Sequence, residues 1–192
     1  MGFNVNYFTI RIIILPTGSY YMHLPIININ IPFPEQFELQ FNKAFRSLKL
    51  LGCDYFYFLG IDGDKRHRFC THEDWMDIYY EEKFILNDPL KRISENTTFI
   101  ALPWEQVTHL HGHEKRTMCG RVSFGLFNGL SIAREYRKRK YMFALATELK
   151  EHDLARYLLV EKIDKLEKFI QDCMKIFDQY LLLMFNSVSD VM

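Results

Sequence analysis

The segment His72–Ile93, HEDWMDIYYEEKFILNDPLKRI, carries the most informative pattern in this chain of 192 residues. Trp75 and Tyr79 are four residues apart, so on a helix the indole and the phenol lie on one face, one turn from each other. Asp88 directly precedes Pro89, and the residue before a proline avoids the α-helical region. We therefore expect the helix to break or restart here, with a carboxylate that can point into a space bordered by the preceding helix.

The residues before this segment predict a helix followed by a β-hairpin. PEQFELQFNKAFRSLKLLG, from Pro34 to Gly52, repeats apolar residues at helical spacing. The aromatic run from Asp54 predicts a strand, DGD at 62–64 predicts a turn, and KRHRFCT predicts the return strand.

The residues after the segment add further strands. TTFIALPW predicts a strand that ends at Pro103, and EQVTHLHGHEKRTMCGRV predicts a short helix and a loop. SFGLFNGLSIA is a strand pattern with a turn or bulge at Asn128-Gly129, and a basic connector, EYRKRK, leads to the strand YMFALATEL. This order predicts an α+β domain, an α-β-α sandwich with a central, mostly antiparallel sheet and helices on both faces.

The last part of the chain predicts one long helix with an apolar stripe. Its apolar residues follow spacings of four and three in alternation: Leu159, Ile163, Leu166, Ile170, Cys173, Phe177, Tyr180 and Met184. The stripe packs on the sheet, forms a dimer seam, or does both.

Composition excludes several classes of function. The 24 basic and 24 acidic residues give no net charge, so nothing favours nucleic acid as a partner. The four cysteines form no C-x-x-C pair, which predicts neither a zinc site nor a redox dithiol and is typical of free thiols in the reducing cytoplasm. No catalytic motif is visible, so we expect no enzyme and no cofactor. An aromatic share of 16% can both build a core and line a small-molecule cavity.

Five positions, in order and with near-family spacing, resemble the autoinducer-binding domain of LuxR-type bacterial quorum-sensing transcription factors. They are Trp75, Tyr79, Asp88-Pro89, Trp104, and Gly129 within the strand FGLFNGLSI, and the resemblance covers about Pro34 to Phe185. It implies a small-molecule sensor for an N-acyl-homoserine lactone or a related amide-containing signal.

The resemblance also implies a role for each residue. The Trp75 indole donates to the ring carbonyl, Asp88 accepts from the ligand amide N–H, and Tyr79 donates its hydroxyl against the amide. Trp104 walls the ring pocket, and Gly129 leaves room. Each role fits the donors and acceptors of its side chain.

Two departures from the family pattern matter. Where the family often has a Tyr-Pro pair before the first tryptophan, this chain has Thr71-His72, so the contact at Thr71 is either lost or made through water. The family also normally adds a helix-turn-helix domain, whereas this chain stops at Met192. We therefore expect a stand-alone or truncated sensor that does not bind nucleic acid directly and modulates transcription indirectly.

These observations divide the chain into an N-terminal extension (1–33), a sensor domain (34–186) and a tail (187–192). Met22 is a candidate natural start. The apolar run Phe8–Leu15 is far shorter than the roughly 20 residues that cross a bilayer, so no membrane association is expected.

Alternatives remain open at this stage. His109, His111 and His113 could bind a metal but fit a solvent loop better, and the segment Arg134–Lys140 could bind an anion but fits a solvated connector better. For the whole chain, the alternative to a sensor is an interaction protein with a vestigial pocket, which pairs with itself or with a full-length regulator. A third reading is an unrelated small-molecule-binding domain that shares only the sheet architecture.

Overall fold

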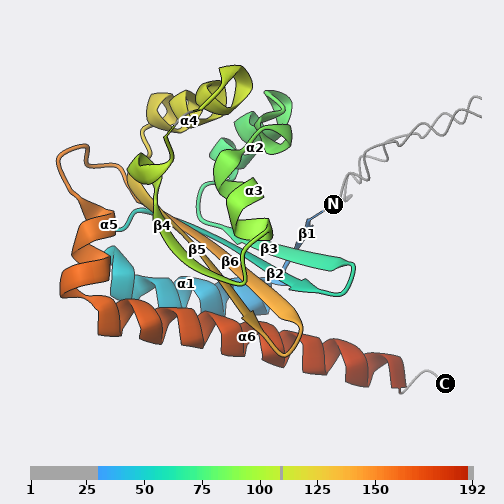
Figure 1. Ribbon diagram of the computed structural model, residues 1–192. Coiled ribbons are helices and arrows are strands. Elements are labelled where there is room, and N and C mark those ends of the chain that lie inside the picture. The colour runs from blue at the N-terminus through green and yellow to red at the C-terminus, as the bar shows by residue number, and fades with distance from the viewer. Residues whose placement is uncertain (1–29, 109, 190–192) are drawn as a thin grey trace, which may run out of the picture.

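The computed structural model describes residues 30–108 and 110–189, and it contains one six-stranded sheet between two layers of helices (Figure 1). The strand order is β1-β3-β2-β6-β5-β4, and all neighbours are antiparallel except the short β1–β3 pair, which is parallel. The strands are β1 (Ile31–Pro32), β2 (Tyr55–Asp62), β3 (Lys65–Cys70), β4 (Phe99–Pro103), β5 (Phe127–Tyr136) and β6 (Arg139–Thr147). The predicted α-β-α sandwich is confirmed.

The helices divide between the two faces of the sheet (Figure 1). One layer holds α1 (Glu35–Lys49), α5 (Leu154–Arg156), the π-helical turn η3 (Tyr157–Glu161) and α6 (Ile163–Ser189). The opposite layer holds α2 (Glu73–Glu81), the 3-10 turn η1 (Phe84–Leu86), α3 (Pro89–Glu95) and α4 (Gly112–Phe124), with the 3-10 turn η2 (Trp104–Gln106) after β4.

The α1–α6 layer builds a dense aromatic core. The apolar positions of α1 that share helical spacing, Phe37, Phe41, Phe45 and Leu48, are all buried. The Phe41 ring lies 4.8 Å from Phe58 of β2 and 5.3 Å from Phe69 of β3, measured between ring centroids. The local pattern therefore becomes tertiary packing because the apolar face of α1 meets the apolar face of the sheet.

The stripe of the terminal helix packs mainly inward. Its central members, Leu166, Ile170, Cys173, Phe177 and Tyr180, are buried against the sheet and α1. Its ends differ, since Ile163 is 40% exposed and Met184 is 47% exposed. Packing on the sheet is thus confirmed for the middle of the stripe, while the dimer seam stays a prediction.

Two segments between elements differ from expectation. The polar stretch before β5 contains a helix of 13 residues, α4, rather than a short helix and a long loop. The basic connector is a two-residue hairpin turn in which Arg137 and Lys138 have φ values of 51° and 65°, and its flanks belong to β5 and β6. Such turns favour Asn-Gly pairs, so Arg-Lys carries no turn signal here.

The N-terminal boundary lies upstream of residue 34. Ile31 and Pro32 pair with β3, and the Phe33 side chain is 4% exposed, so these residues belong to the folded unit. The candidate start at Met22, the run 8–15 and the last three residues lie outside the described residues. Within residues 30–108 and 110–189, no helix combines the length and the apolar character needed to cross a membrane.

The core predicts a large difference between two neighbours on α1. Phe41→Ala should lower the free energy of unfolding by about 3–5 kcal/mol, because the ring is fully buried and its loss leaves a cavity. Leu39→Ala should change it by less than about 0.5 kcal/mol, because Leu39 is 62% exposed. Urea unfolding followed by circular dichroism measures both, and equal losses would contradict the assignment of the buried face.

Candidate ligand-binding site

The sequence around Asp88 creates a helix break that aims a carboxylate inward. Helix α2 ends at Glu81, Lys83 adopts a left-handed conformation with φ 57°, and η1 turns the chain toward α3. Asp88 is the N-cap of α3, where its Oδ1 accepts the Leu90 N–H at 2.9 Å, and Pro89 follows in the first turn. The predicted break and restart at this position is confirmed.

The Asp88 carboxylate collects partners from two other helices. Its Oδ2 accepts the Tyr79 hydroxyl at 2.7 Å and the Arg121 Nη2–H at 2.5 Å. Asp88 is 7% exposed and Arg121 is 6% exposed, so this is a buried ion pair. Buried charges persist only when they are paired and hydrogen-bonded, and here both conditions are met.

Arg121 enters the cluster from α4 and is surrounded by aromatic rings. Its guanidinium carbon lies 5.2 Å from the Trp104 ring centroid, 5.9 Å from Tyr79 and 6.0 Å from Trp75. At these distances the ring faces stabilise a cation. Sequence reasoning missed Arg121, because α4 has almost no apolar periodicity. The one local signal is the i, i+4 pair of Thr117 and Arg121, the two buried residues of that helix.

The pKa shifts follow from burial and from the pairing. Burial alone would lower the pKa of the Arg121 guanidinium, but the charge of Asp88 outweighs this, and the pKa lies above its ordinary value. Burial raises the pKa of the Tyr79 hydroxyl well above 10, and the neighbouring Asp88 charge raises it further. Arg121 therefore stays charged and Tyr79 stays a hydrogen-bond donor near neutral pH.

Trp104 and Gly129 meet as the wall of this region. The Trp104 Nε1–H donates to the Ser131 hydroxyl oxygen at 3.0 Å. A Cβ atom added at Gly129 would lie only 2.3 Å from the Trp104 indole, so the absence of a side chain permits this contact. Gly129 lies where the pairing of β5 with β6 shifts register, which fits the predicted bulge. The space that Gly129 leaves is thus filled by Trp104 itself.

A cavity of about 70 Å³ lies between the sheet and the helices α2, α3 and α4. Its lining includes Trp75, Tyr79, Asp88 and Arg121, together with Tyr57 of β2 and Ser131 of β5. A cavity of about 150 Å³ holds one benzene, and small-molecule sites span about 300–1,000 Å³. In this arrangement of side chains the cavity is too small for an acylated lactone, so such a ligand requires side chains to move.

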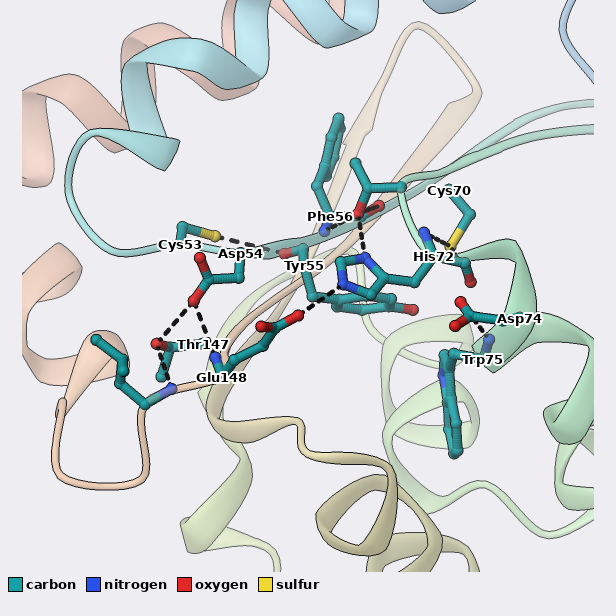
Figure 2. A network of polar contacts seen from close by, with 12 residues as sticks. Cys53, Asp54, Tyr55, Phe56, Cys70, His72, Asp74, Trp75, Thr147 and Glu148 are labelled. Atoms are coloured by element: carbon teal, nitrogen blue, oxygen red, sulfur yellow. Dashed lines mark hydrogen bonds and ion pairs between the residues drawn. The ribbon is translucent and has the colours of Figure 1, made fainter.

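Three of the six predicted site residues line this cavity, and Trp104 and Gly129 stand beside it. Thr71 is not among the lining residues; it precedes His72, whose ring Figure 2 shows directed toward Glu148. The Thr71 Oγ1 accepts the Phe56 N–H at 2.9 Å and lies 2.8 Å from His72 Nδ1, while His72 Nε2 lies 3.1 Å from Glu148. These contacts tie the start of α2 to β2 and to the end of β6, and they hold the helix that carries Trp75.

The other polar candidates have structural surroundings. His111 occupies the N-cap position of α4, and His113 lies in the first turn of that helix. His109 is outside the described residues. Within the described ranges no group of His, Cys, Asp and Glu side chains could hold a metal ion. Arg134 pairs with Glu167 at 2.8 Å, and Arg139 pairs with Asp178 at 2.9 Å, so two cations of the basic segment bind within the fold.

The structure is an α-β-α sandwich with a buried ion pair beside a cavity. A model of the autoinducer-binding domain family matches residues 40–173, so this chain belongs to the autoinducer-binding domain family. Membership supports a signal-binding role. The comparison with curated proteins gave no match.

Solved structures share the architecture at low sequence identity. SdiA in complex with octanoyl-rac-glycerol is 14% identical with a TM-score of 0.58, and the match covers 76% of this chain and 61% of that chain. Escherichia coli SdiA is 14% identical with a TM-score of 0.60, and the match covers 77% of this chain and 63% of that chain. CepR2 of Burkholderia cenocepacia is an N-acylhomoserine lactone dependent LuxR family transcription factor. It is 13% identical with a TM-score of 0.50, and the match covers 80% of this chain and 99% of that chain. This chain thus spans less than two thirds of the SdiA chains.

The contact between Trp104 and Gly129 predicts a rescue experiment. Gly129→Ala should lower the free energy of unfolding by about 1–3 kcal/mol, because the new methyl group overlaps the indole. In a Trp104→Leu background the same substitution should cost less than about 0.5 kcal/mol, because the overlapping ring is gone. Urea unfolding of the four proteins measures both costs, and an equal cost in the two backgrounds would contradict the contact.

Proposed function

We propose that this chain is a signal-binding domain of LuxR type, whose ligand is an N-acyl-homoserine lactone or a related amide-containing signal. The observation that carries the proposal is the convergence of Trp75, Tyr79 and Asp88 on one cavity. Residues from a helix and from the following helix cap face the same space, as recognition of one polar head group requires. The proposed role is that of a sensor and not of an enzyme.

The chemistry of the lining fits such a ligand. Trp75 supplies an indole N–H for the ring carbonyl, Tyr79 supplies a hydroxyl, and Asp88 supplies acceptor oxygens for the amide N–H. Trp104, supported by Gly129, forms the wall toward which the ring would lie. Thr71 is held by its hydrogen bonds to Phe56 and His72 at the start of α2, so its contact with a ligand is lost or made through water. SdiA is in complex with octanoyl-rac-glycerol and CepR2 is N-acylhomoserine lactone dependent, so both acylated classes are suitable first ligands.

The proposed output is an indirect effect on transcription in the cytoplasm. The end of α6 exposes Leu182 and Met184, by 62% and 47%, next to the buried part of the stripe. Exposed apolar side chains on a long helix suit a helix–helix contact. We propose that α6 forms a homodimer or a heterodimer with a related regulator, without direct contact to nucleic acid.

A second candidate function is favoured by one observation. Asp88 is already paired with Arg121, and the cavity measures about 70 Å³. A pocket this small suits an interaction protein that retains the fold but not the ligand. Such a protein would act by dimerising with full-length regulators.

Thermal unfolding with a ligand panel tests the first candidate. N-acyl-homoserine lactones of several chain lengths and an acylglycerol should raise the melting temperature, because a ligand at 100 times its Kd adds about 2.7 kcal/mol of stability. Tyr79→Phe should reduce the shift, because it removes a hydroxyl from the lining. Tyr80→Phe is the matched control and should leave the shift unchanged, since Tyr80 is 38% exposed on the same helix.

The opposite result separates the two candidates. If no ligand shifts the melting temperature, and Ile163→Glu converts a dimer to a monomer, the interaction protein is favoured. Ile163 is suitable because it is 40% exposed, whereas a charge at Ile170, which is 1% exposed, would disrupt the core instead.

A further inference from the structure

Asp88 has little acceptor capacity left for a ligand. Its Oδ2 receives two hydrogen bonds, from Tyr79 and from Arg121, and its Oδ1 receives the Leu90 N–H. A carboxylate offers about two lone-pair sites on each oxygen, so three of about four sites are occupied. The open site is on Oδ1, so a ligand amide N–H that approaches Oδ2 has to compete with Tyr79 and Arg121.

We infer that Arg121 determines ligand specificity: it takes the place on Asp88 that an amide N–H would use, and it favours an acyl ester over the matching acyl amide. The inference rests on the proposed function, because it concerns the same cavity. It keeps the role of a sensor for acylated signals and revises the amide part of the proposed ligand: the preferred head group presents oxygen acceptors and needs no N–H.

The donors around the cavity support this preference. Arg121 has five N–H groups, of which Nη2 serves Asp88 while Nη1 points at the Met118 sulfur at 3.4 Å. A thioether is a weak acceptor, so a carbonyl or ester oxygen in the cavity would be a better partner for the guanidinium. The Ser131 hydroxyl also faces the cavity, and because its oxygen accepts from Trp104, its own proton can be donated to a ligand.

Displacement of Arg121 would be costly. The guanidinium is buried, ion-paired and flanked by three aromatic rings at 5.2–6.0 Å. An amide ligand that takes Asp88 leaves this cation without its carboxylate inside the protein. An ester ligand leaves the ion pair intact and adds an acceptor beside it.

A matched pair of ligands isolates the N–H group. One is N-hexanoyl-homoserine lactone, and the other is its ester analogue, in which an oxygen atom replaces the amide N–H. Isothermal titration calorimetry with the full chain should show that the wild type binds the ester at least about tenfold more tightly than the amide. Arg121→Met should shift the ratio of the two Kd values by about tenfold or more toward the amide, because the freed carboxylate accepts the N–H and repels the ester oxygen.

The control is a second buried arginine. Arg134 is 9% exposed and pairs with Glu167 at 2.8 Å, but it lies outside the cavity lining, so Arg134→Met should keep the wild-type ratio. Since Arg121→Met leaves Asp88 without its cation, circular dichroism must first show that it folds. If it does not, Arg121→Met/Asp88→Asn removes both charges, retains an acceptor oxygen, and should shift the ratio in the same direction.

The outcomes are distinguishable from those of the proposed function. A wild-type preference for the amide that persists in the Arg121 variants overturns this inference and leaves the sensor intact. Amide binding by the Arg121 variants alone supports the inference and contradicts the proposed function for the wild type. If none of the folded proteins binds either ligand, both are overturned.

Discussion

The ion pair between Asp88 and Arg121 is the constraint on which the half of the structure formed by α2, α3 and α4 depends. Its partners come from three elements: Tyr79 from α2, Asp88 from the cap of α3, and Arg121 from α4. Each charge is buried, and neither is tolerable without the other, so the three helices are held in one arrangement over the sheet. The aromatic rings around the guanidinium then pack on a position that the charges have already fixed.

The two faces of the sheet use different kinds of interaction. The α1–α6 face is held mainly by apolar packing, which is non-directional, together with the ion pairs of Arg134 and Arg139 to α6. The α2–α4 face combines a smaller apolar cluster with directional hydrogen bonds and a cavity. The α1–α6 face therefore stabilises the sheet, whereas on the α2–α4 face a hydrogen bond within the protein can be replaced by one to a ligand. The contacts of Thr71 and His72 join the start of α2 to β2 and to Glu148, just after β6. Figure 2 shows His72 directed toward Glu148.

Short-range patterns in the sequence predicted much of the fold and part of the site. The helical spacing of the α1 phenylalanines, the hairpin of β2 and β3, and the break at Asp88-Pro89 all depend on neighbours within a few residues. Arg121 escaped because its partner lies 33 residues away, and a charge in a polar helix gives no sign of burial. The turn at Arg137 and Lys138 escaped because neither residue favours positive φ. The family resemblance predicted both Trp104 and Gly129 as site residues. Only the side-chain geometry shows that the tryptophan fills the space beside the glycine.

A double-mutant cycle on Asp88 and Arg121 tests the central claim most directly. The free energy of unfolding would be measured in urea for the wild type, Asp88→Ala, Arg121→Met and the double variant. If the pair fixes this half of the fold, each single variant loses about 3–5 kcal/mol, since it leaves an unpaired buried charge, and the double variant loses at least about 2 kcal/mol less than the sum. Losses that add within about 0.5 kcal/mol would contradict the account.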